Sequence, residues 1–221
     1  MAAAPASWIR KHLHIVGARI QAELQGKSCL PMELVRPAKQ SICTSRSFGR
    51  SVGTLAELQQ AVATFAGKCA LKLRTENALA SMLTVFIATS PFDESGNRYW
   101  GTRTAALPHS SQDSIAILRV AEAILAGIFR DGMVYKKAGV IVSGLVPKEQ
   151  CSRTLSLFPE EEPATNERDA KLMQAMDAIN KRYGRGAVHL AAENSEAWKP
   201  NQERLSPCYT TRWDDIIEVK R

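Results

Sequence analysis

Residues 38–50, AKQSICTSRSFGR, decide how the rest of the chain is arranged. Ile42, Cys43 and Thr44 favour a β-strand, and the residues after them are small, hydroxyl-bearing or basic around one aromatic, Phe48. We expect an edge strand over 40–48 that presents hydroxyls, backbone N–H groups and a guanidinium to phosphates. Two plainer interpretations stay open: a solvated strand end, or a turn that ends at Gly49.

The segments that follow alternate between helical and strand patterns. A helix is expected over 55–74, because Leu58, Val62 and Phe65 recur at helical spacing and Thr54 with Glu57 forms a capping box. Strands are expected over 78–89, 99–108 and 135–145, and a second helix over 114–130 that is opened by Asp113 or Ser114. The order β-α-β-β-α-β predicts an α+β fold, in which a four-stranded antiparallel sheet carries both helices on one face.

The uncovered face of such a sheet is a candidate nucleic-acid platform. Residues 38–150 carry thirteen Lys and Arg against eight Asp and Glu, although ordinary solvated surface remains the alternative. Arg46 shares its parity with Ile42 and Phe48, so it would need a bulge to reach the uncovered face. The predicted DNA-binding residues are Ser45, Arg46, Ser47, Arg50, Arg98, Arg103, Lys136 and Lys137.

Smaller units are predicted on either side. Residues 1–37 form a helix over 8–25 and a Pro-containing linker, 38–146 the sheet domain, 147–165 a second linker, and 166–221 a small α+β domain. That last domain has a helix over 167–183, with the stripe Leu172, Met176, Ile179 and Tyr183, and a short strand over 187–191. Its aromatics, Trp198, Tyr209 and Trp213, either form its core or stack on bases.

A short apolar segment stands out in the second linker. Residues 154–158, TLSLF, lie in a polar segment bounded by prolines, which suits insertion into an apolar pocket of a partner. The alternative is that the segment folds back on the sheet domain as a last strand.

The composition indicates a reduced, intracellular protein without a metal site. The chain has a net charge of +7 and five cysteines, none of them paired as CxxC, and His12 and His14 are not spaced to share a helix face. The first residues have no apolar signal core, and no apolar run is long enough to span a membrane. We therefore predict a cytoplasmic protein, nucleoid-associated when bound to nucleic acid, and expect no cofactor.

Three short motifs occur in a distinctive order: SRSFG at the start of the βαββαβ unit, then TLSLF, then LSPCYTTRWDDI. In this order they resemble the C-terminal half of UmuC-type Y-family translesion DNA polymerases, the catalytic subunit type of DNA polymerase V. The resemblance implies that 38–146 is a little finger, which grips template–primer duplex DNA in SOS repair and mutagenesis. It also implies that the N-terminal helix, with ELQGKSCLPME, is the end of a thumb.

The same resemblance assigns partners. TLSLF is similar to the family's sliding-clamp-binding peptide: Leu155, Leu157 and Phe158 match the apolar anchors, Ser156 fits the spacer, and Thr154 departs from the usual Gln. UmuD-type accessory subunits and a recombinase filament are further partners that the family implies.

Polymerase chemistry is not expected from this chain alone. No residues match the palm carboxylates that hold the metal ions for phosphoryl transfer, so Mg²⁺ is expected only for a complete polymerase. The predicted activity is binding. Two alternatives remain: a split-gene subunit that works with a separate palm chain, and a βαββαβ RNA-binding module, although the aromatic strand signature of RNA-binding modules is not found.

Overall fold

The computed structural model describes residues 1–34, 37–92, 98–150, 165–193, 198–199 and 206–217. The chain divides into two compact units, Met1–Ala38 and Lys39–Arg221. The first unit holds helix α1 (Ala6–Leu24), which bends at His14, where φ is 55°. The apolar residues of 8–25 recur at helical spacing, which predicts one apolar stripe, but the bend interrupts the 3.6-residue period and the stripe does not lie on one face. Ile9 is buried, whereas the other members are exposed (Leu13, Val16, Ile20 and Leu24).

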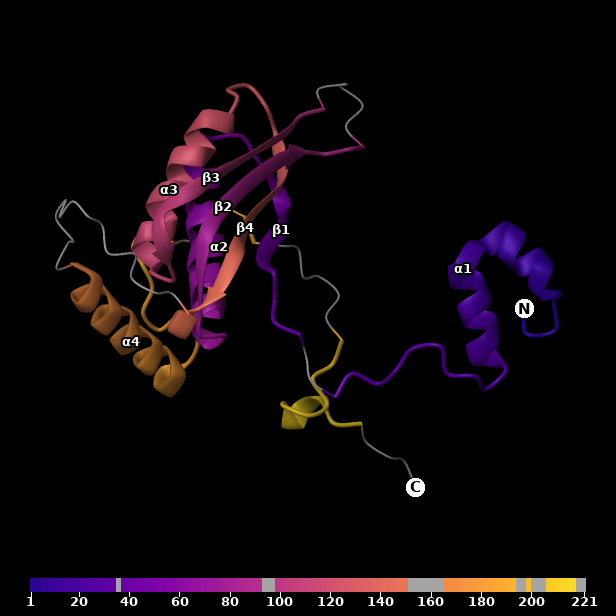
Figure 1. The fold of residues 1–221 in the computed structure, drawn as a ribbon. Helices are drawn as coiled ribbons and strands as arrows, with labels where there is room; N and C mark the ends of the chain where they lie inside the picture. The colour runs from indigo at the N-terminus through magenta and orange to yellow at the C-terminus, as the bar shows by residue number, and fades with distance from the viewer. Residues whose placement is uncertain (35–36, 93–97, 151–164, 194–197, 200–205, 218–221) are drawn as a thin grey trace. The chain divides into compact units, whose positions relative to one another are not determined.

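The second unit is built on a four-stranded antiparallel sheet (Figure 1). Its elements are β1 (Ser41–Val52), α2 (Leu55–Thr75), β2 (Ala78–Thr89), β3 (Trp100–Ser111), α3 (Ser114–Ile128) and β4 (Tyr135–Pro147). The strand order is β1-β4-β2-β3, which leaves β1 and β3 at the edges. This confirms the predicted α+β class and the edge position of the first strand.

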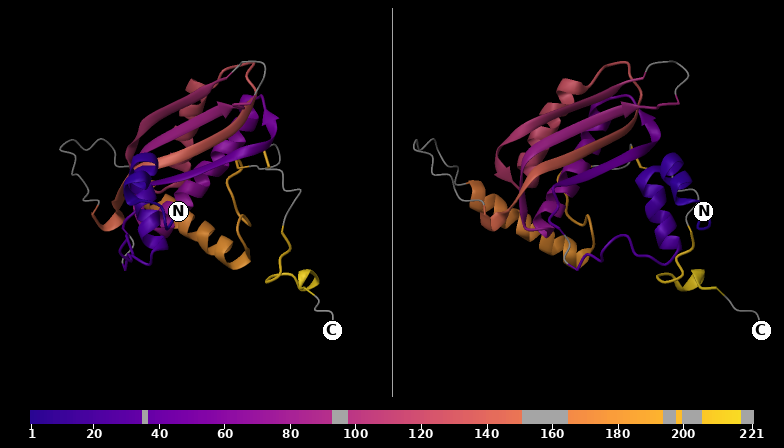
Figure 2. Two further views of the ribbon diagram at one scale, coloured as in Figure 1. Left: turned by 90° about the vertical axis from the view of Figure 1, so that its right-hand side faces the viewer. Right: turned by 45° about the vertical axis from the view of Figure 1, so that its right-hand side comes forward.

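Both helices cover the same face of the sheet, and the other face is left open (Figures 1 and 2). Each begins at a predicted cap: the Thr54 hydroxyl accepts a hydrogen bond from the Glu57 N–H at 3.3 Å, and the Asp113 carboxylate accepts from the Ala116 N–H at 2.9 Å. The stripe of α2 is buried as expected, including Leu58, Phe65 and Leu73. Burial of these apolar side chains against the sheet is the main force that holds the helices there.

The strands place their apolar residues toward the helices by alternation. Ile42 of β1, Val142 of β4 and Leu83 of β2 are paired in one row across the sheet, and all three are buried. Cys69 of α2 meets this layer, since its thiol lies 3.3 Å from the Thr44 hydroxyl, and burial raises the pKa of the thiol. The core therefore lies between α2, α3 and one face of the sheet.

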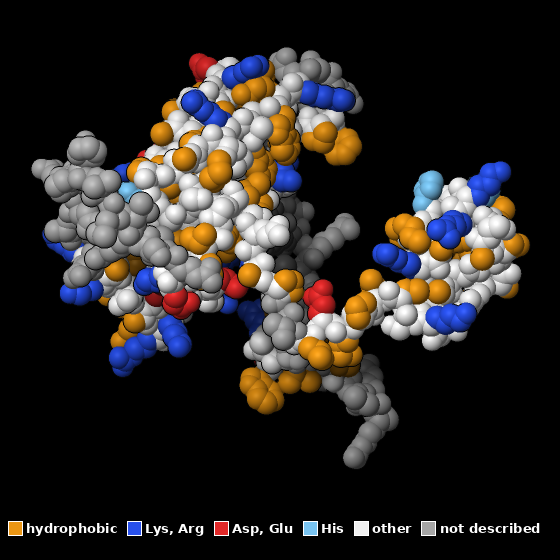
Figure 3. Space-filling view, viewed as in Figure 1, with side chains coloured by type: hydrophobic (Ala, Val, Ile, Leu, Met, Phe, Trp, Pro, Cys, Tyr) orange, Lys and Arg blue, Asp and Glu red, His pale blue; other side chains and the backbone are white. Residues whose placement is uncertain are grey.

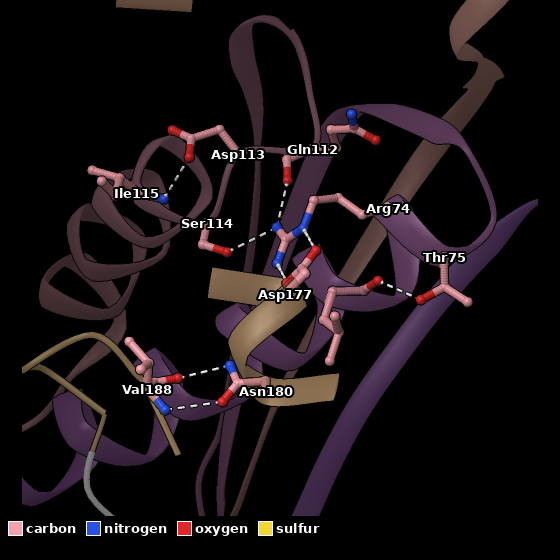
Figure 4. A network of polar contacts seen from close by, with 10 residues as sticks. Arg74, Thr75, Gln112, Asp113, Ser114, Ile115, Asp177, Asn180 and Val188 are labelled. Carbon is pink, nitrogen blue, oxygen red and sulfur yellow. Dashed lines mark hydrogen bonds and ion pairs between the residues drawn. The ribbon is translucent and has the colours of Figure 1, made fainter. Parts of the chain in front are cut away.

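Helix α4 (Thr165–Tyr183) is fixed to the sheet unit by a partly buried polar network (Figure 4). The Arg74 guanidinium binds both carboxylate oxygens of Asp177, at 2.6 and 2.9 Å, and also donates to the Ser114 hydroxyl and the Gln112 carbonyl. Met173, one turn before Asp177, is 2% exposed. The predicted α4 stripe is therefore wrong: the network turns the Met173–Asp177 face inward and leaves Leu172, Ile179 and Tyr183 exposed.

The short strand predicted over 187–191 is also wrong. These residues form turn and irregular backbone. The side-chain amide of Asn180 donates to the Val188 carbonyl at 2.8 Å and accepts from the Val188 N–H at 2.9 Å (Figure 4). A side chain therefore satisfies the backbone groups that a neighbouring strand would otherwise pair.

Trp198 belongs to the core of the sheet unit. It is 3% exposed and lies edge-on to Phe65 of α2, with ring centroids 4.9 Å apart, and near Phe48 of β1 at 6.5 Å. The carbonyl of the next residue, Lys199, accepts a hydrogen bond from the Gly49 N–H at 3.0 Å. The predicted core of a separate C-terminal domain is therefore wrong: Trp198 joins the core of the sheet unit, and Tyr209 and Trp213 are exposed.

Candidate nucleic-acid interface

The open face of the sheet is a continuous array formed by the strand registers. Residues that stand directly opposite each other in an antiparallel pair share a face, so the three registers fix which side chains lie together. The four rows, each read from β1 through β4 and β2 to β3, are Ser41–Ser143–Met82–Ala106, Cys43–Ile141–Thr84–Thr104, Ser45–Gly139–Phe86–Thr102 and Ser47–Lys137–Ala88–Trp100.

This array is rich in hydroxyl groups and carries no carboxylate. Serine and threonine are its commonest members, and its one charged residue is Lys137. The hydroxyls of Thr84 and Thr104 lie 2.8 Å apart and hydrogen-bond to each other across the strands. A face with hydroxyl donors, a cation and no acidic residue can approach a polyanion without charge repulsion.

Three of the predicted DNA-binding residues come together on this face. Ser47 stands opposite Lys137, and Ser45 lies one row away, opposite Gly139. Ser47 is exposed, and Ser45 and Lys137 are half-buried. These side chains form the polar end of the array next to the β1 edge.

Arg46 and Arg103 lie on the helix-covered face. Arg46 stands opposite Ala138. The pKa of Lys68 on α2 is lowered mainly by burial, and the positive charge of Arg46 lowers it further. A Cβ placed on Gly127 of α3 would lie 2.9 Å from Nη1 of Arg103, so that guanidinium rests against α3. The bulge that Arg46 would need comes later, after Ser47, and both arginines remain exposed at the rims of the sheet.

The remaining predicted basic residues surround the β1 bulge or the start of β3. Lys136 donates to the Gly49 carbonyl at 2.9 Å. Arg50 pairs with Glu57 at 2.7 Å, and the Thr54 hydroxyl and this guanidinium lower the pKa of that carboxyl. Arg98 is exposed just before β3. Lys136 and Arg50 therefore already have protein partners. On the side shown in Figure 3, basic side chains of this unit are scattered over the surface rather than gathered in one patch.

Sequence reasoning missed an aromatic pair on the open face. The rings of Phe86 and Trp100 are stacked, 5.3 Å apart with an interplanar angle of 8°, and the Lys137 ammonium lies 5.8 Å from the centre of the Phe86 ring. The signal was present in β3, where Trp100, Thr102 and Thr104 alternate with residues of the other face. By contrast, Phe48 of β1 and Tyr99, just before β3, both pack toward the core.

Other kinds of site receive no support from the described residues. They contain no group of three or more His, Cys, Asp or Glu side chains placed to hold a metal ion. Nor does any helix within the described ranges combine the length and apolarity needed to cross a bilayer. The predicted clamp-binding segment, Thr154, Leu155, Ser156, Leu157 and Phe158, lies outside the described residues.

A four-stranded antiparallel sheet with both helices on one face and an open hydroxyl-rich face on the other defines a βαββαβ module. The profile of the impB/mucB/samB family C-terminal domain matches residues 39–157, more than half of the chain, and that of a domain of unknown function (DUF4113) matches 170–219. The chain therefore belongs to the impB/mucB/samB family, and the predicted resemblance to UmuC-type Y-family polymerases is confirmed.

Curated relatives match nearly all of this chain. Protein UmuC of Salmonella typhimurium is 38% identical over 216 residues, which cover 97% of this chain and 50% of that protein. Protein MucB of Escherichia coli is 38% identical over 217 residues, with 98% and 50% covered. DNA polymerase IV of Desulfatibacillum aliphaticivorans is 29% identical over 185 residues, with 84% and 44% covered. The chain thus spans about half the length of the relatives that it matches.

Proposed function

We propose that this chain is the DNA-gripping and clamp-docking portion of an error-prone translesion DNA polymerase that acts in SOS repair and mutagenesis. The observation that carries the proposal is the open sheet face, which presents Ser45, Ser47 and Lys137 together and holds no carboxylate. Membership of the impB/mucB/samB family supports the polymerase assignment. The ligand is duplex template–primer DNA, which the face contacts along its phosphates.

The grip is sequence-independent. Hydroxyls and an ammonium on a sheet bind phosphate oxygens, which every base pair presents, and they do not read base edges. Basic side chains at the rims of the sheet contribute by attracting the DNA backbone at longer range. They are Arg46, Arg50, Arg98, Arg103 and Lys136. Because each neutralised phosphate releases counterions, affinity falls steeply as salt rises.

Two paired variants test where the DNA lies. Duplex binding is measured by fluorescence anisotropy over a range of salt concentrations for Ser47→Ala with Lys137→Ala, and for Arg46→Ala with Arg103→Ala. We expect the first pair to weaken binding more at every salt concentration, and the log–log salt slope to fall by about 1 for the lost Lys137 contact. If Ser47→Ala with Lys137→Ala binds duplex DNA as tightly as the unaltered chain does, the open face is not part of the interface.

Clamp docking is proposed through residues 154–158. Leu157→Ala with Phe158→Ala removes two apolar anchors and should abolish capture by a bacterial sliding clamp, whereas Ser156→Ala, which changes only the spacer, should preserve it. Undiminished capture by the double variant would refute the docking role without affecting the DNA assignment. In a primer-extension assay the isolated chain should incorporate no nucleotide.

A further inference from the structure

The aromatic pair on the open face has an unusual construction. A Cβ placed on Gly139 would lie 2.5 Å from Cε1 of Phe86 and 2.5 Å from Cβ of Ser45. The Phe86 ring therefore lies down across β4, in space that only a glycine leaves free. The Trp100 indole stacks almost parallel to that ring. The result is a layered aromatic step on a sheet face whose other members are mostly small or hydroxylic.

The two rings differ in their exposure. Phe86 is 7% exposed, whereas Trp100 is 59% exposed. Phe86 thus covers the glycine gap and supports one face of the indole, and most of Trp100 stays in water. An indole held in place by stacking but left uncovered adds little to the core, and it provides a rigid apolar plane for a flat ligand.

The groups beside the indole indicate which flat ligand fits. Lys137 stands in the same row as Trp100, two strands or about 10 Å away, with the small Ala88 between them. Thr102 is the next residue of β3 on the same face, and the array carries no carboxylate. An aromatic plane with a cation and hydroxyls alongside matches a nucleotide, whose base stacks while its phosphates meet the polar groups.

We infer that Trp100 is a stacking site for one unpaired nucleobase of single-stranded DNA that continues from the bound duplex. The inference deepens the proposed function and rests on it for the identity of the ligand. The hydroxyl and lysine groups hold the duplex phosphates, and Trp100 recognises the end of the duplex through the first unstacked base. Any base satisfies the site, because every base has a π-face.

The experiment separates base stacking from phosphate binding. The full chain is titrated with three labelled DNAs: a blunt hairpin duplex, the same duplex with a short thymidine overhang, and the same duplex with an overhang of abasic sites. The last carries the phosphates without the bases. We expect the thymidine overhang to tighten binding and the abasic overhang not to do so.

Variants of Trp100 then locate the contact. Trp100→Ala should bind the thymidine overhang about 5- to 150-fold more weakly, which is the range for loss of one stacked base, and should bind the blunt duplex unchanged. Trp100→Phe should keep most of the gain and Trp100→Leu should lose it, because both fill the space but only phenylalanine stacks. Trp8→Ala removes a tryptophan of similar exposure, 53% against 59% for Trp100; it is the matched control and should behave as the unaltered chain.

Each contrary outcome has a distinct meaning. An abasic overhang that binds as well as thymidine, or a Trp100→Leu variant that matches Trp100→Phe, would overturn the stacking site. An RNA overhang that gains more from Trp100 than the DNA overhang would overturn its assignment to DNA. If the blunt duplex binds neither the unaltered chain nor its variants, the proposed function is removed instead. The binding of a single-stranded thymidine oligonucleotide to the unaltered chain and to Trp100→Ala would then still decide for or against the stacking site.

Discussion

Trp198→Ala is the substitution that most directly tests how the C-terminal segment joins the sheet unit. Trp198 is 3% exposed and packs against Phe65 and Phe48, while the ammonium of Lys68 lies 5.8 Å from the centre of its ring. The tryptophan thus fills a space between α2 and β1. Alanine would leave that space empty and would also remove two aromatic contacts.

The magnitude follows from burial. A buried aromatic side chain removes 150–250 Å² from water, which at ~25 cal/mol per Å² gives about 4–6 kcal/mol as an upper bound. Measured Trp-to-Ala and Phe-to-Ala substitutions in cores cost ~3–5 kcal/mol. We therefore expect a loss of about 4 kcal/mol in the free energy of unfolding, or ~8–16 °C in Tm for a unit of this size.

The assay is urea unfolding of the full chain, followed by far-ultraviolet circular dichroism, beside Trp213→Ala. Trp213 lies in the same C-terminal segment and is 89% exposed, so its loss should change the free energy of unfolding by less than ~0.5 kcal/mol. A Trp198→Ala loss below about 1 kcal/mol, or a C-terminal segment that unfolds in a separate transition with the sheet unchanged, would refute the assignment of Trp198 to the sheet core.

Two further substitutions test local features. Gly139→Ala pushes a methyl group into the Phe86 ring and should cost ~1–3 kcal/mol by urea unfolding, whereas Gly53→Ala, where the nearest atom is 4.0 Å away, should be close to neutral. Burial raises the pKa of Glu193, so the folded state holds that proton more tightly than the unfolded chain. Stability from this group is therefore present at low pH and is lost as pH rises above about 4.5 through the raised pKa. Glu193→Gln should flatten that fall in Tm between pH 4 and 7 and raise Tm at pH 7.

The fold could be predicted because its signals are local and agree with one another. The Thr54 and Asp113 caps, the stripe of α2 and the apolar strands each specify one element, and their order leaves few topologies. The bulge in β1 could not be predicted in the same way. It depends on Lys136 and Lys199, which meet Gly49 from remote parts of the chain.

The candidate site could be predicted only where the alternation of side chains along a strand decides which face of the sheet a residue occupies. Ser45 and Ser47 share a face because they are two residues apart, and Lys137 joins them because of the β1–β4 register. Arg46 and Arg103 were predicted to bind DNA because of their charge, yet their positions along β1 and β3 place both on the helix-covered side. The tertiary contacts of α4 were beyond local pattern, since Asp177 meets an arginine 103 residues away.

The position of β1 explains why one strand can serve both the core and the open face. Up to Ser47 its register with β4 is regular, so Ser45 and Ser47 stay on the open side. Phe48 then turns inward to the ring of Trp198. The Gly49 N–H donates to the Lys199 carbonyl, and the Gly49 carbonyl accepts from the side chain of Lys136 on β4. An edge strand has unpaired backbone groups on one side, and here a remote part of the chain satisfies one of them. Trp198 and Lys199 therefore hold the end of the strand that carries the proposed phosphate contacts, and the Trp198 ring does so from the helix-covered side, against Phe65 of α2.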